Sequence, residues 1–93
     1  MSEIQANKYV LCKYDQNYYI GIIMEHFKEN CECEVKFMTP KFSQTASYSW
    51  PLCDDICYVP LENMICIVDI YTPTGCQYLL TEQCKKDVID LLN

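Results

Sequence analysis

Six aromatic side chains stand at the ends of strand-like runs and in one loop, and they are the residues best suited to ligand chemistry. The faces of aromatic rings attract cations, and alkylated ammonium groups are recognised by cages of such rings. A carboxylate beside the rings, from Glu25, Asp54 or Asp55, would add negative charge. The candidate binding residues are therefore Tyr14, Tyr19, Phe37, Phe42, Tyr48, Trp50, Asp54 and Asp55.

The competing interpretation is that these rings simply fill a small core, because aromatic side chains dominate core burial. That interpretation is favoured for Phe37 and Trp50. For Tyr14 and Tyr19, which lie on either side of the polar turn at residues 15–17, both interpretations stand. If the flanking runs form a hairpin, the two tyrosines come to one end of neighbouring strands, where Phe37 can stand beside them as a third wall.

A structural zinc centre is the second kind of site that the sequence offers. Its candidate ligands are His26, Cys31, Cys33, Cys53 and Cys57. Structural zinc commonly uses cysteines spaced as Cys-x-x-Cys. The pairs at 31–33 and 53–57 depart from that spacing, and cysteines in a strand fit a core equally well. We therefore expect no metal and no cofactor.

Catalysis has little support in the residue pattern. His26 is the only histidine, and no nucleophile adjoins it in the sequence, although a Cys/His pair formed in three dimensions stays open. The acidic pair Asp54-Asp55 fits a turn cap or a solvated position. Gly21 and Gly75 are the only glycines, so there is no Gly-rich phosphate loop. The sequence therefore predicts a protein that is not an enzyme.

The charge balance indicates the class of partner. Thirteen acidic residues face seven basic ones, for a formal net charge of −6, and the basic residues are scattered. Nucleic-acid binding depends on basic groups that neutralise phosphates. We therefore expect no direct binding of DNA or RNA, and an acidic surface instead suits a basic peptide. No apolar run approaches the roughly 20 residues that span a bilayer, so no membrane association is expected.

The eight cysteines bear on the compartment. An even number of cysteines in a short chain is compatible with a disulfide framework. However, the first residues, MSEIQANK, lack the basic and apolar segments of a signal peptide. The cysteines also lie mostly in apolar runs, where a free thiol behaves as a small core residue. Reduced thiols and an intracellular location are therefore expected.

Hydrophobic patterning predicts mostly strands, at residues 8–14, 18–27, 31–38 and 61–70. Residues 31–38 alternate, with an apolar face that comprises Cys31, Cys33, Val35 and Phe37. Residues 39–47 are expected to form a loop, 48–50 and 76–80 short strands, and 53–60 a compact segment with a single helical turn. Short strands joined by tight turns favour a small five-stranded barrel over a sandwich.

The last segment has the pattern of a helix. Thr81 can cap it, and Glu82 would lie in its first turn, where negative charge is favourable. An apolar stripe follows at helical spacing, formed by Cys84, Val88, Leu91 and Leu92. The expected organisation is therefore a flexible lead at residues 1–7, a barrel at residues 8–80 and a helix at residues 81–93 that packs on the barrel.

Residues 12–37, CKYDQNYYIGIIMEHFKENCECEVKF, resemble the opening of a Tudor domain. The matching positions are the aromatic residues Tyr14, Tyr19 and Phe37 and the small residue Gly21. The likeness covers about a third of the chain, and other SH3-like barrels share much of the pattern. Where many Tudor domains have a Tyr-Gly-Asn type of turn after the third strand, this chain has MTPKFSQTASYSWP, so the resemblance does not fix the last cage positions. A second segment, YSWPLCDDICYVPLENMICIV, is similar to the tails of transposon-related nuclear proteins.

These resemblances imply an SH3-like, Tudor-like barrel that binds a protein or peptide, in particular a basic peptide with a methylated Lys or Arg. They also imply a nuclear location and a role in chromatin. The alternative from another class is a scaffold or dimerisation domain that uses a sheet edge or an exposed apolar face in a nuclear complex. We expect the methylated peptide to be held by the aromatic candidates, with Tyr14 and Tyr19 at the mouth of the barrel.

Overall fold

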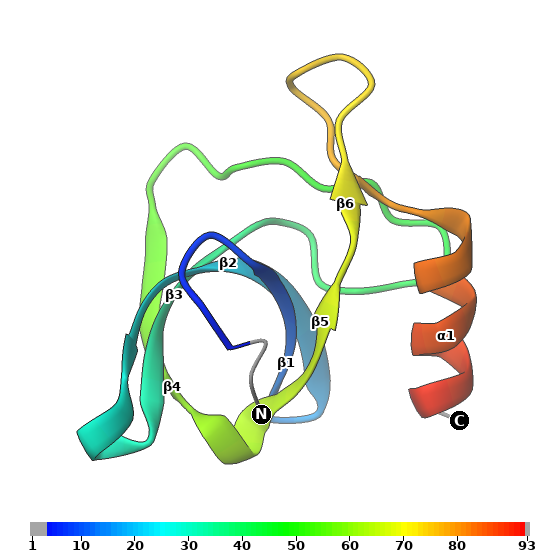
Figure 1. Cartoon of the computed structure of the whole chain (residues 1–93). Coiled ribbons are helices and arrows are strands. Elements are labelled where there is room, and N and C mark those ends of the chain that lie inside the picture. The colour runs from blue at the N-terminus through cyan, green and yellow to red at the C-terminus, as the bar shows by residue number, and fades with distance from the viewer. Residues whose placement is uncertain (1–3, 93) are drawn as a thin grey trace.

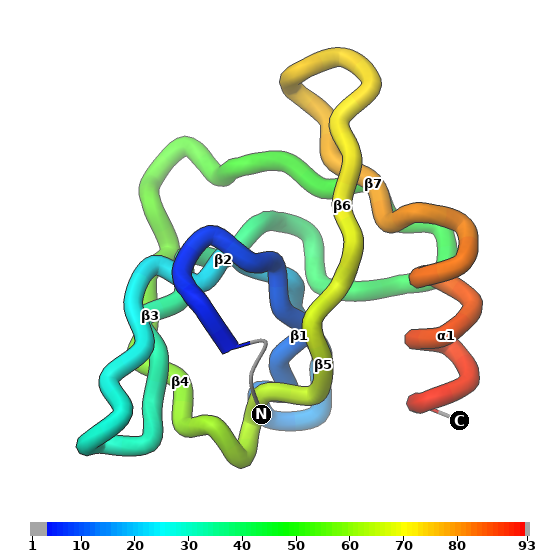
Figure 2. Tube along the Cα trace, in the orientation of Figure 1, coloured from blue at the N-terminus to red at the C-terminus, as the bar shows by residue number. Residues whose placement is uncertain are grey.

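The fold was obtained as a computed structural model, which describes residues 4–92 (Figures 1 and 2). The main sheet contains β1 (Tyr9–Tyr14), β2 (Asn17–Phe27), β3 (Glu32–Phe37), β4 (Asp55–Pro60) and β5 (Met64–Val68). The short 3-10 helices are η1 (Lys28–Asn30), between β2 and β3, and η2 (Leu61–Asn63), between β4 and β5. A separate ribbon is formed by β6 (Ile70–Tyr71) and β7 (Leu79–Leu80), and α1 (Glu82–Leu92) follows it. The prediction of a mainly β chain with one late helix is confirmed.

The strands of the main sheet follow the order β4-β3-β2-β1-β5, and every pairing is antiparallel. The register shifts between Ile23 and Glu25 in the β2–β3 pair and between Leu11 and Cys12 in the β1–β5 pair. Such bulges bend a strand and increase its twist. The sheet curls, and its strands curve around a shared interior (Figure 1). Because η2 joins the two edge strands, β4 and β5 meet at that end of the molecule.

The turn between β1 and β2 consists of Asp15 and Gln16. Asp15 has a φ of 55°, in the left-handed region that aspartate adopts more readily than most residues. Asn17, which was expected in the turn, is instead the first residue of β2 and lies opposite Tyr14. A two-residue turn fixes the register of a hairpin. It thereby fixes which side chains of β1 and β2 share a face.

Apolar side chains are buried on both faces of the sheet. The inner core, inside the curl, consists of Val10, Cys12, Ile23, Cys33, Val35, Phe37 and Val59. The outer core lies on the opposite face and consists of Leu11, Ile20, Met38, Tyr48, Val68, Leu80, Cys84 and Val88. Successive residues of a strand point to opposite faces, so β1 contributes to both cores. The helix and the loop after β3 cover the outer core.

Helix α1 is held to the sheet by one side, which carries Cys84, Val88 and Leu92. The Thr81 hydroxyl accepts a hydrogen bond from the Cys84 N–H at 3.3 Å, which caps the helix as expected. Cys84 and Val88 are buried in the outer core. The expectation that Leu91 also packs on the sheet is wrong, because its side chain is 57% exposed. A groove between α1 and the end of β5 lies beside Leu91, and Leu92 contacts the outer core instead.

Three further expectations about local structure are corrected. Residues 53–60 do not contain a helical turn; residues 55–60 of this segment form strand β4, and the helical turn occurs after it, at η2. Residues 48–50 do not extend into a strand, because Tyr48 makes an isolated bridge with Tyr78 and Ser49 makes another with Thr39. Cys31 does not share the inward face of β3, because its left-handed backbone, with a φ of 53°, ends η1 and leaves its side chain exposed.

The lead before β1 is described from residue 4 onward, and residues 1–3 and 93 lie outside the described residues. Ile4 packs against the inner core, and the Asn7 N–H donates a hydrogen bond to the Ile23 carbonyl at 2.7 Å. This part of the lead is therefore attached to the sheet. Within residues 4–92, no helix has the length and apolar character needed to cross a membrane.

Candidate functional site

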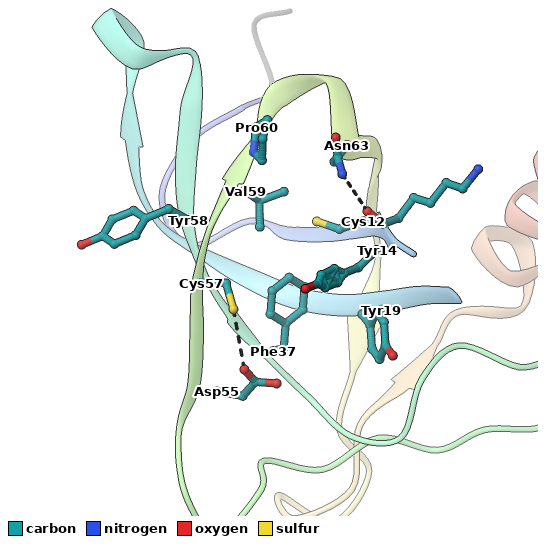
Figure 3. Close-up of a pocket in the computed structure, with 11 residues that line it drawn as sticks. Cys12, Tyr14, Tyr19, Phe37, Asp55, Cys57, Tyr58, Val59, Pro60 and Asn63 are labelled. Atoms are coloured by element: carbon teal, nitrogen blue, oxygen red, sulfur yellow. Dashed lines mark hydrogen bonds between the residues drawn. The ribbon is translucent and has the colours of Figure 1, made fainter. Parts of the chain in front are cut away.

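A pocket of ≈ 560 Å³ opens where the β1–β2 hairpin, the end of β3 and the strand β4 come together (Figure 3). Its walls combine aromatic, aliphatic, thiol and carboxylate groups. The lining residues are Cys12, Lys13, Tyr14, Tyr19, Phe37, Asp55, Cys57, Tyr58, Val59, Pro60 and Asn63. Four of the eight candidate binding residues, Tyr14, Tyr19, Phe37 and Asp55, are in this set.

Strand register explains why these four residues meet. Tyr19 lies opposite Cys12, two residues before Tyr14, so both tyrosines belong to the same face of the hairpin. Phe37 ends β3 and lies opposite Asp55, which begins β4. Side chains of directly opposed residues point to the same face of a sheet. The curl of the sheet then brings the hairpin end and the β3–β4 end to one pocket.

The ring of Phe37 lies across β2 at Gly21, its direct partner in the register. A Cβ atom at position 21 would lie 3.0 Å from Cδ1 of Phe37 and 2.6 Å from Cγ1 of Val35, closer than real contacts allow. The glycine therefore lets the Phe37 ring approach the sheet. From there Phe37 makes an edge contact with Tyr19, at 6.2 Å between ring centroids and 72° between ring planes.

The three rings differ in how far they are exposed. Phe37 is only 8% exposed and belongs to the inner core, so it forms the floor of the pocket. Tyr19 is half-buried, and Tyr14 is 60% exposed at the rim. Figure 3 shows the three rings grouped together, with Asp55 and Cys57 on the β4 side. Phe37 thus serves both the core and the pocket.

The carboxylate of Asp55 is the negative group of the pocket wall, and the thiol of Cys57 donates a hydrogen bond to its Oδ1 atom at 3.8 Å. The pKa of the Cys57 thiol is raised, first by desolvation and then by the charge and hydrogen bond of Asp55. Cys57 therefore stays protonated and neutral at physiological pH. A negative charge beside aromatic faces favours a cationic ligand.

The opposite rim is fixed by a contact between η2 and β1. The Asn63 Nδ2 group donates a hydrogen bond to the Lys13 carbonyl at 3.1 Å. This bond ties the segment that joins the two edge strands to the end of the hairpin. The pocket is thus framed by ordered secondary structure rather than by a long loop.

The other four candidate residues lie outside the pocket lining. Tyr48 is 1% exposed in the outer core, so its ring has no face left for a ligand. Phe42 packs against the same core. Trp50 makes an edge contact with Tyr78 at 5.8 Å between centroids. These three belong to the segment after β3, which covers the outer face of the sheet, away from the pocket.

Asp54 is paired within the chain. Its Oδ1 atom lies 3.5 Å from Nζ of Lys36, and the same ammonium group lies 4.9 Å from the centroid of the Trp50 ring. Trp50 therefore already has a cation on its face. Asp54 and Trp50 form a small internal cluster with Lys36 and do not join the three rings of the pocket.

Sequence reasoning missed the β4 wall, which comprises Cys57, Tyr58, Val59 and Pro60, and the η2 residue Asn63. The signal that could have found the wall is the alternation along residues 55–60, in which Asp55, Cys57 and Val59 share one face. The prediction of a helical turn in residues 53–60 is incompatible with that alternation, so the wall was not predicted. The contribution of Asn63 depends on the curl of the sheet, which the local pattern does not reveal.

The zinc candidates do not come together. Among residues 4–92, no group of three or more His, Cys, Asp or Glu side chains has an arrangement that could hold a metal ion. All eight cysteines are free thiols in the structure. Both ring nitrogens of His26 are buried without a hydrogen-bond partner, so His26 has no hydrogen bond to a nucleophile.

No protein family model, curated protein or solved structure matches the chain significantly. The structure itself establishes the class: a mainly β protein with a curled five-stranded antiparallel sheet, one C-terminal helix and a pocket of aromatic and acidic side chains.

Proposed function

We propose that the chain is a non-catalytic, SH3-like barrel of the Tudor type that binds the alkylated side chain of a Lys or Arg residue in a basic peptide. Two features of the fold support the barrel assignment. The 3-10 helix η2 carries the chain between the two edge strands, and β5 pairs with β1 after the crossing. Such a connection brings the two edges of a curled sheet toward each other, as a small barrel requires.

The observation that carries the binding proposal is the convergence of Tyr14, Tyr19, Phe37 and Asp55 on one pocket. An alkylated ammonium or guanidinium group keeps its positive charge but exposes apolar carbon. Ring faces contact that carbon and attract the charge at the same time. Asp55 adds a second attraction and accepts a hydrogen bond from any N–H that the modified group retains.

The expected partner is a basic protein segment, because the chain carries a formal net charge of −6. A nuclear location and a role at chromatin are part of the same proposal, and the resemblances of residues 12–37 and 48–68 support them. Direct nucleic-acid binding is not part of it, because no basic patch adjoins the pocket; Lys13 is the one basic residue in its lining.

The proposal is tested with a double variant. Calorimetric titration with N-acetyl-dimethyl-lysine amide, and with the unmodified lysine amide, measures whether alkylation is recognised. We expect the modified form alone to bind and the variant Tyr14→Ala/Tyr19→Ala to lose binding while it still unfolds cooperatively. Each good cation–ring contact is worth roughly 0.5–2 kcal/mol. Tyr71→Ala is the matched control, because Tyr71 is also exposed but lies on β6, outside the pocket lining.

Two results would reject the proposal. Unchanged binding by the double variant places the ligand elsewhere, and failure of that variant to fold assigns the rings to the core. Binding of modified and unmodified lysine amide with equal affinity removes the role of alkylation.

A second candidate function is a scaffold domain, which the exposed apolar side chains of β4 favour. Ile56 and Tyr58 are 43% and 61% exposed on the outer face of the sheet. A scaffold that dimerises through this face has a mass that rises with concentration toward twice 10.9 kDa. Sedimentation equilibrium decides between the two functions, since the reader is expected to stay at the mass of one chain.

A further inference from the structure

The free edge of β4 adds a second feature beside the pocket. β4 is the last strand on its side of the main sheet, and within residues 4–92 it pairs with β3 alone. Its first four residues, 55–58, are all exposed, and Val59 is the one buried residue of the strand. A strand that is exposed on both faces and along one edge offers its backbone to another extended chain.

One backbone hydrogen bond shows which residues of β4 direct their backbone groups toward β3. The Leu61 N–H donates a hydrogen bond to the Cys31 carbonyl at 2.9 Å, in the same register that pairs Val59 with Cys33. In an antiparallel ladder, alternate residues direct both backbone groups toward the partner strand. Val59 therefore directs its N–H and C=O toward β3, as do the residues two and four positions before it.

The intervening residues direct their backbone groups away from β3. Ile56 and Tyr58 each present one N–H donor and one C=O acceptor along the free edge. Pro60 lies at the next outward position, and it fits there because a residue that faces away from the ladder needs no N–H. The free edge therefore offers two residues, Ile56 and Tyr58, whose N–H and C=O groups can both pair with an added strand.

An added strand would place alternate side chains on the two faces of β4. A residue opposite Cys57 would point to the inner face, into the pocket where Cys57 and Asp55 lie. Its neighbours, opposite Ile56 and Tyr58, would point to the outer face. Figure 3 shows this division on β4 itself: Tyr58 is among the lining residues of the pocket, but its ring points away from the pocket.

The outer face beside Tyr58 is acidic. Glu34 lies directly between Glu25 on β2 and Tyr58 on β4, and Glu32 is two residues away on the same face. Among residues 4–92, none of the three carboxylates has an ion-pair partner. Like charges directly opposite each other destabilise a sheet. A cation placed over Tyr58 would relieve that repulsion and contact the ring face.

We propose that an extended basic peptide adds to the free edge of β4 as a further strand. One residue places its alkylated cation in the pocket, and an adjacent Lys or Arg lies over Tyr58 beside Glu34. The pocket half of this inference rests on the proposed function, whereas the pairing with Ile56 and Tyr58 is independent of it. The preferred ligand is thus a modified residue directly flanked by a basic one, rather than a modified residue alone.

The test uses a short alanine-based peptide with dimethyl-lysine between two arginines. Ile56→Pro removes the outward N–H at a position in phase with Pro60 and leaves the bonds to β3 intact. Ile56→Ala is the control, because it removes the side chain and keeps the N–H. We expect the proline variant to bind the peptide about three- to tenfold more weakly than the alanine variant. Both should bind N-acetyl-dimethyl-lysine amide as the unchanged chain does.

A second measurement does not depend on the folding of any variant. The same peptide, methylated on the backbone nitrogens of its three central residues, keeps every side chain but loses its donors. We expect it to bind the unchanged chain no better than N-acetyl-dimethyl-lysine amide does. Equal affinity of the methylated and unmethylated peptides would overturn strand addition.

The two proposals fail in different ways. If Tyr14→Ala/Tyr19→Ala abolishes peptide binding and backbone methylation has no effect, the pocket stands and strand addition is rejected. If backbone methylation abolishes binding and the tyrosine variant has no effect, strand addition stands and the pocket is rejected. If the chain dimerises and Ile56→Pro prevents it, a second copy occupies the edge and the peptide proposal is overturned.

Discussion

Gly21 and Phe37 lie directly opposite each other on β2 and β3, and the Phe37 ring occupies space that a side chain at position 21 would need. This pair links the core to the pocket, because Phe37 belongs to the inner core and forms the pocket floor. The position of one glycine therefore affects both the stability of the sheet and the shape of the site.

Gly21→Ala is expected to lower the free energy of unfolding by about 1–3 kcal/mol, the range typical of overpacked cores. The added Cβ would meet the Lys36 carbonyl oxygen at 2.6 Å, and backbone cannot move aside as a flexible side chain can. Urea denaturation measures the change. Gly75→Ala is the comparison. The φ of 82° at this position strains an alanine, but no heavy atom beyond the chain neighbours lies within 4 Å of the added Cβ. This variant should therefore leave ligand binding unaltered. Unchanged stability of Gly21→Ala would disprove the close approach.

Two residues of the apolar stripe on α1, Val88 and Leu91, should contribute differently to the stability of the fold. Val88→Ala should cost about 1–3 kcal/mol of stability, because Val88 is buried in the outer core. Leu91→Ala should change it by less than about 0.5 kcal/mol, since that side chain is mostly exposed. Melting temperatures of the two variants decide the matter. A larger loss from Leu91→Ala than from Val88→Ala contradicts the packing described for α1.

The thiols should differ in reactivity. Under non-reducing conditions, the denatured chain is expected to titrate eight thiols with a disulfide-exchange reagent, one for each cysteine. In the folded chain, three of the four exposed cysteines, Cys31, Cys53 and Cys76, should react first. Cys12 should react last, because desolvation is the main cause that raises its pKa to about 12. A denatured count well below eight, or a fast reaction at Cys12, contradicts this order.

The raised pKa of Cys12 also predicts how stability changes with pH. The thiol has a pKa near 9.0 when solvated and about 12 in the folded chain, so the folded state keeps a proton that the unfolded state releases. The contribution of this thiol to the free energy of unfolding should therefore not change with pH below pH 9.0, and it should fall as the pH rises toward 12. One thiol contributes at most about 1.4 kcal/mol per pH unit.

Urea denaturation across the alkaline range tests this prediction. Cys12→Ala should be less stable below pH 9.0, because it leaves a cavity, but its stability should fall less steeply as the pH rises above that value. Tyr48 contributes to the residual slope, because desolvation raises its pKa from 10.0 to about 12. Identical slopes for the variant and the unchanged chain would show that Cys12 is not the group responsible.

The sequence predicted the parts of the site that depend on local pattern. Tyr14 and Tyr19 lie on either side of the predicted turn at residues 15–17, and a hairpin there is enough to bring them to one end of neighbouring strands. Their shared face depends on the shorter turn at residues 15–16, which pairs Tyr14 with Asn17. Phe37 follows from the alternation of β3. Tyr48 and Trp50 could not be assigned in this way, because the short strand expected at residues 48–50 is replaced by isolated bridges and no strand period indicates which face each ring covers. Their burial depends on how residues 38–50 pass over the outer core, a long-range arrangement.

The most direct test of the central claim is an NMR titration of the folded chain with N-acetyl-dimethyl-lysine amide. The account predicts that the amide signals of Tyr14, Tyr19, Phe37 and Asp55 shift together and saturate with one dissociation constant, while unmodified lysine amide leaves them in place. Shifts that centre on Trp50 and Asp54, or equal shifts with the unmodified amide, would contradict the claim that this pocket recognises an alkylated cation.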